Sequence, residues 1–333
     1  MKLGIAGAGM IVVQGLLQFV HEISGIEIVG ISATKRSEEK LKRLSEEYHI
    51  PYTFTDYDEM LGVKEIDTVY VAVTNELHYE FCKKAILAGK HVICEKPFTI
   101  CVDEVKELYD LVKQHQVILL EAITNQYSPN YLKIKEEVKK LGNIHVVSCN
   151  YSQYSSRYDA FKRGEILPVF DVNQSGGALM DLNIYNIHFV VGLFGKPKNV
   201  HYFANIERGI DTSGIVVLEY DSLKAICIGA KDCDAPITST IQGDLGCIKI
   251  EGPTSTLADV SLIKNKEKYV IDSLDKHRMY SEFKCFSEYI DNKNYEVCDK
   301  MLKHSKIVMD VLTKARKSAN IIFHIQKQCW RFF

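Results

Sequence analysis

The sequence predicts a doubly wound α/β domain followed by a second domain built on antiparallel strands. The chain has 333 residues, about twice the usual size of one domain. Short strand patterns alternate with helical patterns up to residue 122, and the rhythm then changes to strands separated by short turns. We therefore expect two domains, 1–122 and 123–333, and leave open whether the C-terminal helices pack back on the first.

The first domain shows apolar runs that are rich in Val and Ile and lack strict alternation, as parallel strands buried on both faces do. These runs cover 2–6, 27–32, 68–73, 91–94 and 117–120. Amphipathic patterns predict helices between them over 37–48, 78–88 and 102–115. This strand–helix order is typical of a parallel sheet with helices on both faces.

The second domain begins with a helical pattern over 129–141. Strand patterns follow over 144–154, 199–206, 214–220, 223–230, 237–242, 246–251 and 259–272, and helices are expected over 279–291 and 299–318. Short turns such as "EYDSLKA" and "QGDLGC" predict an antiparallel meander. The segment 175–194 interrupts the strands with a helical pattern that contains "SGGALMDLNIYNIHF".

The composition is that of an ordinary globular protein, with 46% hydrophobic and 25% charged residues and a formal net charge of −2. We expect no nucleic-acid partner and no membrane partner. The ten cysteines form no C-x-x-C pair, so we predict no metal site and reduced thiols in the cytoplasm. Gln14 interrupts the apolar N-terminus and no small-residue cleavage site follows, which favours a first strand over a signal peptide.

The stretch "LGIAGAGMIV" predicts a dinucleotide site. In a strand–turn–helix unit, the glycines let the backbone approach a pyrophosphate at the helix N-terminus. The candidate contacts are Gly7, Gly9, Met10 and Ile11. Val12 stands where the fingerprint has its third small residue, and a simple strand–helix turn is the alternative interpretation.

The end of the second predicted strand indicates the choice of dinucleotide. NAD enzymes usually place an acid there for the ribose 2′-hydroxyl, whereas basic groups accommodate a 2′-phosphate. This chain has Thr34, Lys35 and Arg36, with no acid before Glu38. We predict NADP(H), with NAD(H) as the second choice, and the alternative is that Lys35 and Arg36 belong to a solvated loop.

Three further stretches, "VAVTNELHYEFCKKAILAGKHVICEKP", "LLEA" and "GGALMDLNIY", extend the pattern over nearly the whole chain. Together with the glycine fingerprint they resemble the family named for glucose–fructose oxidoreductase, inositol dehydrogenase and MocA. The resemblance implies a Rossmann domain plus an α+β domain with an open, mostly antiparallel sheet that mediates homodimers. It also implies NAD(P)-dependent oxidation or reduction of sugars, polyols or related small carbonyl or diol substrates.

The resemblance assigns roles residue by residue. Thr74, Asn75 and His78 match the stretch beside the cofactor, where Thr74 replaces the usual Pro; Glu95, Lys96 and Pro97 match the E-K-P motif, whose Lys reaches nicotinamide and substrate; Asp181 and Tyr185 match the catalytic Asp and Tyr/His. Asn183 stands where the family usually has Gly, and Gln126 stands where many sugar-acting members have Arg.

These residue types suit hydride transfer, because a group must move a proton at the substrate oxygen. A nearby ammonium stabilises a phenolate, so Lys96 and Tyr185 form a workable acid/base pair. Residues 181, 185 and 188 share one face of an α-helix, which makes His188 a further candidate, as the acid or as a support. The alternative is an amphipathic helix with a core Tyr and a satisfied buried His.

Three functions follow from these interpretations. The first is an oxidoreductase of a sugar-like, polyol or small carbonyl substrate. The second is a dinucleotide-binding regulator or sensor without turnover, and the third is a structural subunit of a dimer. The complete Lys96, Asp181 and Tyr185 set favours the first. The substrate itself and the direction of the reaction are not determined by the sequence.

Overall fold

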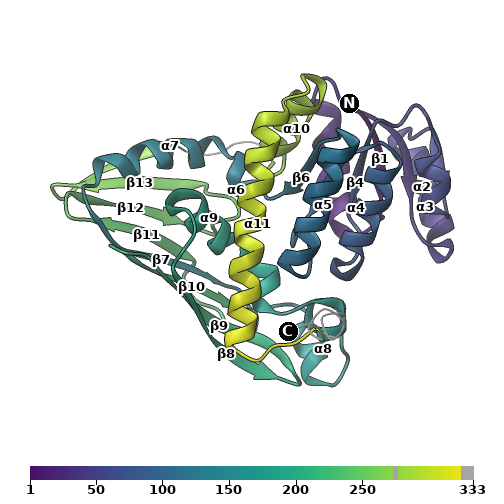
Figure 1. Ribbon diagram of the computed structural model, residues 1–333. Helices are drawn as coiled ribbons and strands as arrows, with labels where there is room; N and C mark the ends of the chain where they lie inside the picture. Colours follow the sequence, from purple (N-terminus) through teal and green to yellow (C-terminus); the bar gives the residue numbers. More distant parts are fainter. Residues whose placement is uncertain (273–276, 324–333) are drawn as a thin grey trace. The chain divides into compact units, whose positions relative to one another are not determined.

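The computed structural model describes residues 1–272 and 277–323. It forms two compact units, which Figure 1 shows with their helices and strands labelled. Unit 1 consists of Met1–Ala122 and Met279–Lys306, and unit 2 consists of Ile123–Arg278 and the chain from Ile307 onward. The division falls inside the long helix α11, Tyr295–Ser318.

Unit 1 contains a parallel six-stranded sheet in the order β3-β2-β1-β4-β5-β6, the order of a Rossmann fold. Its strands are β1 Lys2–Ala6, β2 Glu27–Ser32, β3 Tyr52–Phe54, β4 Thr68–Val71, β5 His91–Glu95 and β6 Leu119–Ala122. The predicted α/β class is confirmed, and the first two strands agree with the sequence to the residue.

The last strand of this sheet was wrongly placed at 117–120. Gln116 ends the preceding helix in a left-handed conformation, with φ of 53°. The N–H of Val117 then bonds back to the carbonyl of Val112 at 3.2 Å, so Val117 still belongs to the helix end. The strand therefore begins two residues later, at Leu119.

Helices flank the sheet on both sides. A π-helical stretch, Ile11–Leu16, leads into the short α1, Leu17–Phe19. The others are α2 Glu38–Tyr48, α3 Tyr57–Leu61, α4 His78–Leu87, α5 Val102–His115 and α10 Tyr280–Asp291. The C-terminal α10 belongs to this unit because Phe283 packs edge-on against Tyr70 of β4, with ring centroids 5.2 Å apart. The N-terminal ammonium also bonds to Asp291 at 2.9 Å.

Unit 2 contains an eight-stranded sheet in the order β14-β13-β12-β11-β7-β10-β9-β8. Its strands are β7 Ile144–Ser152, β8 Asn199–Glu207, β9 Ile210–Glu219, β10 Lys224–Ala230, β11 Thr238–Gly243, β12 Gly246–Glu251, β13 Asp259–Lys264 and β14 Glu267–Asp272. The mostly antiparallel class is confirmed, but a single meander is wrong. β7 inserts between β11 and β10 and runs parallel to β10, because a long connection with helices separates it from the next strand.

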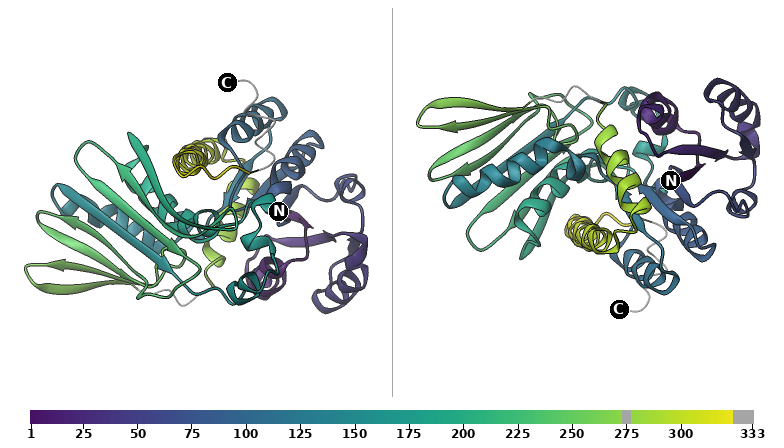
Figure 2. Two further views of the ribbon diagram at one scale, coloured as in Figure 1. Left: turned by 90° about the horizontal axis from the view of Figure 1, so that it is seen from below. Right: turned by 90° about the horizontal axis from the view of Figure 1, so that it is seen from above.

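Helices cover one face of this sheet, as Figure 2 shows from two sides. They include α6 Thr124–Tyr127, α7 Pro129–Glu137 and α9 Ile184–Phe194, and a short α8, Tyr158–Lys162, lies in the loop after β7. Tyr131 of α7 packs edge-on against Phe189 of α9, with ring centroids 6.2 Å apart. Side chains of the other face are more exposed, and Phe203 and its cross-strand partner Ile215 have 66% and 41% of their surface exposed.

The segment predicted as one helix over 175–194 is not regular. A short turn, Val172–Gln174, ends at Ser175 in a left-handed conformation. A π-helical stretch, Leu179–Asn183, then leads into α9. By length and composition Val172–Phe194 is the one run among the described residues that could cross a bilayer. Of its apolar stretch of 18 residues, 72% is buried inside the protein.

A buried carboxylate holds the start of this segment. Asp211 of β9 accepts hydrogen bonds from the N–H of Leu179 at 2.7 Å and from the hydroxyl of Tyr202 at 2.8 Å. Gly177 has φ of +104°, and a Cβ there would lie 2.1 Å from the Asp211 carboxylate. Burial raises the pKa of Asp211 to about 6, although both hydrogen bonds oppose this shift. Asp211 thus satisfies a free helix N–H from a distant strand.

Replacing Asp211 with Asn should change how stability depends on pH. The raised pKa means that the folded state binds the proton more tightly than the unfolded chain, whose aspartates have a pKa of about 3.9. The stabilisation that this tighter proton binding gives the folded state is fully present below about pH 3.9, and it is lost as the pH rises through 6. The unfolding free energy of the wild type relative to Asp211→Asn should fall by about 2 kcal/mol between pH 4 and 7.5. Urea unfolding measures it, with the exposed Asp221→Asn as control, and a pH-independent difference would contradict it.

Candidate active site

A pocket of about 550 Å³ opens in unit 1 at the carboxyl ends of the parallel strands. Ligands of open α/β sheets bind in this position, where the strand order reverses. The pocket is lined by Gly7, Ala8, Gly9, Ile11, Ser32, Ala33, Thr34, Ser37, Thr55, Tyr57, Ala72, Val73, Thr74, Leu77 and Phe81. It brings together Gly7, Gly9, Ile11, Thr34 and Thr74 of the predicted cofactor residues.

The two glycines of the fingerprint have different roles. Gly7 has φ of +115°, and a Cβ there would lie 2.3 Å from the carbonyl oxygen of Ala72, which directly follows the neighbouring strand β4. Only glycine fits this turn. A Cβ on Gly9 would meet no atom within 4 Å, so the space beside this backbone is open on the pocket side. A tight turn beside an open approach fits the pyrophosphate of a dinucleotide.

The basic residues predicted to bind a 2′-phosphate lie at the edge of this pocket. Lys35 and Arg36 form an exposed 3-10 turn, Lys35–Ser37, flanked by the pocket residues Thr34 and Ser37. Sequence reasoning missed Lys40, one turn further along, whose ammonium bonds to the carbonyl of Ala8 at 2.6 Å. The spacing of Lys40 from Arg36 was the signal that could have found it.

One wall of the pocket carries a stacked aromatic pair that sequence reasoning also missed. Tyr57 and Phe81 have ring centroids 4.4 Å apart and an interplanar angle of 26°. Tyr57 comes from the short α3, which was not predicted because five residues are too few to show a period.

Two other predicted cofactor residues do not line the pocket. Met10 is 59% exposed, and Asn75 begins a 3-10 turn, Asn75–Leu77, directly after the pocket residue Thr74.

The loop that carries Lys96 is fixed from several sides. Lys96 directly follows β5 and is half-buried. Two of the residues predicted to contact the cofactor are buried. His78 is fully buried, and its Nδ1 lies 2.8 Å from the carbonyl oxygen of Pro97. Glu95 accepts a hydrogen bond from the hydroxyl of Tyr70 at 2.6 Å. Burial lowers the pKa of His78, which favours the neutral ring. Glu121 accepts the N–H of Phe98 at 3.1 Å.

In unit 2, the predicted catalytic residues Asp181 and Tyr185 each contact a cation that sequence reasoning did not identify. Asp181 forms an ion pair with Lys231, which directly follows β10. Arg278 donates a hydrogen bond from Nη1 to the hydroxyl of Tyr185 at 3.3 Å. No sequence motif surrounds either cation. Both lie beside Asp181 and Tyr185 because chain segments that are distant in the sequence pack together in the fold.

Two buried asparagines anchor the segment that carries Asp181 and Tyr185. Asn183 donates to the carbonyl of Cys227 at 2.9 Å, and Asn186 donates to the carbonyl of Ile228 at 2.9 Å, both on β10. A Cβ on Gly229 would lie 2.6 Å from Cβ of Asn183. The side chain that replaces the family's Gly at position 183 therefore fits because β10 has a glycine opposite it.

His188 lies deeper than the other two. Its side chain is fully buried, whereas that of Asp181 is 33% exposed and Tyr185 has 6% of its surface exposed. The amide of Gln126 donates to the backbone carbonyl of His188 at 3.0 Å, so Gln126 packs against the backbone of α9. Such burial suits a supporting residue more than one that touches substrate.

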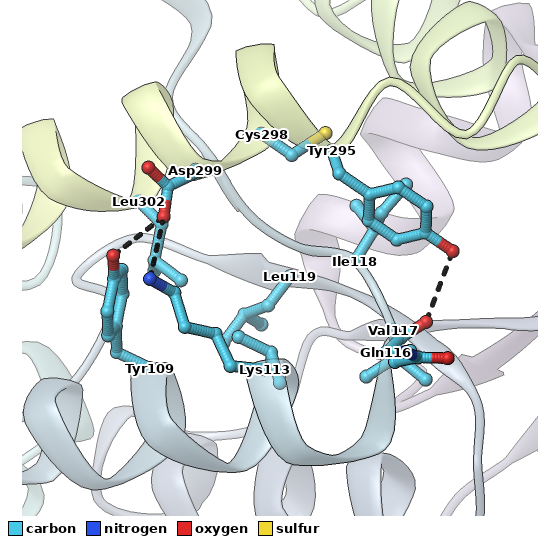
Figure 3. A pocket seen from close by; sticks show the side chains of 11 residues that line it. Tyr109, Lys113, Gln116, Val117, Ile118, Leu119, Tyr295, Cys298, Asp299 and Leu302 are labelled. Atoms are coloured by element: carbon cyan, nitrogen blue, oxygen red, sulfur yellow. Dashed lines mark hydrogen bonds and ion pairs between the residues drawn. The ribbon is translucent and has the colours of Figure 1, made fainter.

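A further pocket of about 370 Å³ in unit 1 is separate from this site (Figure 3). It lies between α5 and α11 at the amino end of β6, whereas the cofactor pocket lies at the carboxyl ends of the strands. Tyr109 bonds to Asp299 at 2.7 Å and Tyr295 bonds to the carbonyl of Gln116 at 3.2 Å, at opposite ends of an apolar wall. None of the predicted site residues lines it.

Comparison with known proteins agrees with these features. The profile of the GFO/IDH/MocA oxidoreductase family with an NAD-binding Rossmann fold matches residues 1–123, and that of the GFO/IDH/MocA C-terminal domain matches residues 131–249. The chain is 30% identical over 311 residues to a scyllo-inositol 2-dehydrogenase (NADP(+)) of Bacillus subtilis, covering 92% of this chain and 94% of the relative. It is 30% identical to D-xylose 1-dehydrogenase (NADP(+)) 2 of Haloferax volcanii, over 67% of this chain and 66% of the relative.

A solved structure shows the same fold. The 3-ketoreductase of Actinomadura kijaniata in complex with NADP and TDP-benzene has a TM-score of 0.83 and 18% identity, covering 96% of this chain and 97% of that one. With the family profiles, the matches make this protein an NAD(P)-dependent oxidoreductase and do not support the regulator alternative. The chain belongs to the GFO/IDH/MocA family of oxidoreductases.

Proposed function

We propose that this oxidoreductase transfers a hydride between NADP(H) and a hydroxyl-bearing carbon of a polyol or sugar-like substrate. The observation that carries the proposal is the polar cluster of unit 2, in which Asp181 is paired with Lys231 and the hydroxyl of Tyr185 is bonded to Arg278. A core helix does not need an acid and a phenol, each held by a cation. The inositol and xylose dehydrogenases to which the chain is similar support the substrate class.

The proposed roles follow from the chemistry of the side chains. When bound, nicotinamide supplies or accepts the hydride. Tyr185 gives or takes the proton at the substrate oxygen, and Asp181 holds a substrate hydroxyl by accepting its hydrogen bond. The ammonium of Lys96 compensates negative charge that develops on the reacting oxygen. We assign His188 a supporting role, because its side chain is fully buried.

The proposed cofactor contacts come from the loops of unit 1. They are Gly7, Gly9 and Ile11 for the pyrophosphate, Thr34, Lys35 and Arg36 for the adenosine phosphate, and Thr74, Asn75 and Lys96 toward the nicotinamide. Met10, which does not line the pocket, is not among them. The pocket supports Gly7, Gly9, Ile11, Thr34 and Thr74 as direct contacts. His78 and Glu95 act by holding the Lys96 loop, since both are buried and bonded within it.

Two substitutions test the assignment of the reaction. Lys96→Met keeps the length of the side chain but removes its charge, so kcat should collapse by several powers of ten while the Kd for NADPH changes little. Tyr185→Phe removes one oxygen and should lower kcat by roughly 10² to 10⁴, the usual contribution of a positioned acid. Steady-state kinetics on a panel of inositols, aldoses and polyols, with NADPH binding by fluorescence, measures both.

The buried His188 provides the comparison. If Tyr185→Phe kept wild-type kcat while His188→Gln abolished it, His188 would be the acid and Tyr185 a core residue. Unchanged melting temperatures of the variants would show that lost turnover is not lost folding.

We propose a preference for NADP(H) over NAD(H). Lys35 and Arg36 are exposed beside the pocket residues Thr34 and Ser37, and no acid stands between Ser32 and Ser37. The relatives named as NADP(+) enzymes support this choice.

The preference is tested by KM for both cofactors. The double substitution Lys35→Ala, Arg36→Ala should raise KM for NADPH roughly 10- to 100-fold, as expected when charged hydrogen bonds to a phosphate are lost, and leave KM for NADH nearly unchanged. Lys42→Ala on the next helix, α2, which breaks an exposed pair with Glu38 at 3.1 Å, is the control. A wild-type preference for NADH would contradict the proposal.

We propose that the protein forms a homodimer through the open face of the unit 2 sheet. Phe203 of β8, Ile215 of β9 and Ile228 of β10 are cross-strand neighbours and make an apolar row on that face. Light scattering should give twice the chain mass of 37.9 kDa for the wild type and one chain mass for Ile215→Glu. Leu132→Glu, which changes an exposed residue of α7 on the opposite face, should remain dimeric.

A cytoplasmic location is part of the same proposal. The nine cysteines of the described chain are free thiols, as in a reducing compartment. Fractionation of cells that produce the protein would test it.

A further inference from the structure

Lys231 is a buried lysine in the cluster of unit 2. Its side chain is only 3% exposed, and its ammonium contacts Oδ2 of Asp181. By contrast, Lys196 of the same unit pairs with Asp310 at 3.0 Å while its own side chain is 57% exposed. A lysine is seldom buried unless its charge is paired, so the position of Lys231 depends on Asp181.

The backbone and the stem of Lys231 are held in place. Its N–H donates to the carbonyl of Thr212 at 2.8 Å, and its carbonyl accepts the N–H of Ser155 at 2.9 Å. Its ammonium also lies 5.1 Å from the ring centroid of Phe170, which stacks on Phe161 with centroids 4.8 Å apart. The ammonium is therefore a fixed point against which a carboxylate can be positioned.

Stability alone does not explain such a pair. Removing two charges from water costs about as much as their attraction returns, so a buried ion pair contributes little net stability compared with apolar residues of the same size. What the pair does provide is a single position for the carboxylate. Asp181 sits in the π-helical stretch, with its N–H bonded to the carbonyl of Gly177 at 3.1 Å, so its backbone is fixed as well.

We infer that Lys231 is a positioning residue for the reaction: it holds the carboxylate of Asp181 in the orientation in which that group binds substrate. The inference rests on the proposed role of Asp181. Lys231 touches Asp181 and acts through it, without contacting the reacting atoms itself. A fixed carboxylate needs no reorganisation when substrate binds, and misplacing a catalytic group by about 1 Å costs about 10²-fold in rate.

A double-mutant cycle tests this dependence. Lys231→Met keeps the stem and removes the ammonium, so kcat should fall about 10²-fold while the Kd for NADPH is unchanged. In an Asp181→Asn background the same substitution should have no further effect on kcat, because the group it positions is already lost. Lys231→Arg should recover part of the activity. Lys196→Met, which breaks the exposed pair, should keep wild-type kcat.

The stability of the four proteins of the cycle, namely the wild type, Lys231→Met, Asp181→Asn and the double variant, gives a second readout. Lys231→Met leaves a partly buried carboxylate without its cation and should lower the melting temperature, and adding Asp181→Asn should restore part of it. If Lys231→Met is too unstable to assay, Lys231→Arg decides: it keeps the charge but moves it, so it should lower kcat in the wild type and not in Asp181→Asn.

The outcomes separate this inference from the proposed function. Equal losses of kcat from Lys231→Met in both backgrounds would show that Lys231 acts independently, which would overturn the inference. Wild-type kcat for Lys231→Met beside an impaired Asp181→Asn would also overturn it and leave the proposed function standing. Wild-type kcat for Asp181→Asn would remove Asp181 from the reaction, and with it the basis of both.

Discussion

The close approach of the segment 179–194 to β10 is the constraint on which the site of unit 2 depends. Gly229 has no side chain, and Asn183 occupies the space that a Cβ would fill. At this separation the amides of Asn183 and Asn186 reach the β10 carbonyls of Cys227 and Ile228. The residue that directly follows β10 is Lys231, so the same docking that buries the helix also brings Asp181 to its cation. A bulkier residue at 229 would move all of these groups together.

In unit 1, backbone turns at the carboxyl ends of the parallel strands position most of the candidate residues. Gly7 must be glycine because its backbone conformation and the carbonyl of Ala72 exclude a side chain. Several buried polar residues, among them His78 and Glu121, satisfy backbone groups of the loop around Lys96 instead of facing solvent. Residues that a motif marks as functional can therefore act by fixing a loop, and burial distinguishes them from residues that line the pocket.

Both π-helical stretches of the described chain lie at these sites: one follows the glycine turn, and the other contains Asp181. A π-helical turn gives up some packing and hydrogen-bond quality and often marks a functional position. The first stretch begins with the candidate residue Ile11, and the second leads into α9, which carries Tyr185 and His188. Regular α-helical spacing is therefore a poor guide to which residues share a face at the start of these helices.

The sequence by itself determined the parallel sheet of unit 1, the mostly antiparallel character of unit 2 and the identity of Gly7, Lys96, Asp181 and Tyr185 as candidates. These features depend on local patterns, namely period, turn residues and motif spacing. The parallel pairing of β7 with β10, the anchoring of Asn183, and the contacts of Lys231 and Arg278 were decided only by the tertiary structure. Each joins residues that are at least 40 positions apart, and no local pattern encodes which distant groups meet. The burial of a charge beside its partner is a property of the packed chain, so its chemical consequence could be read only from the fold.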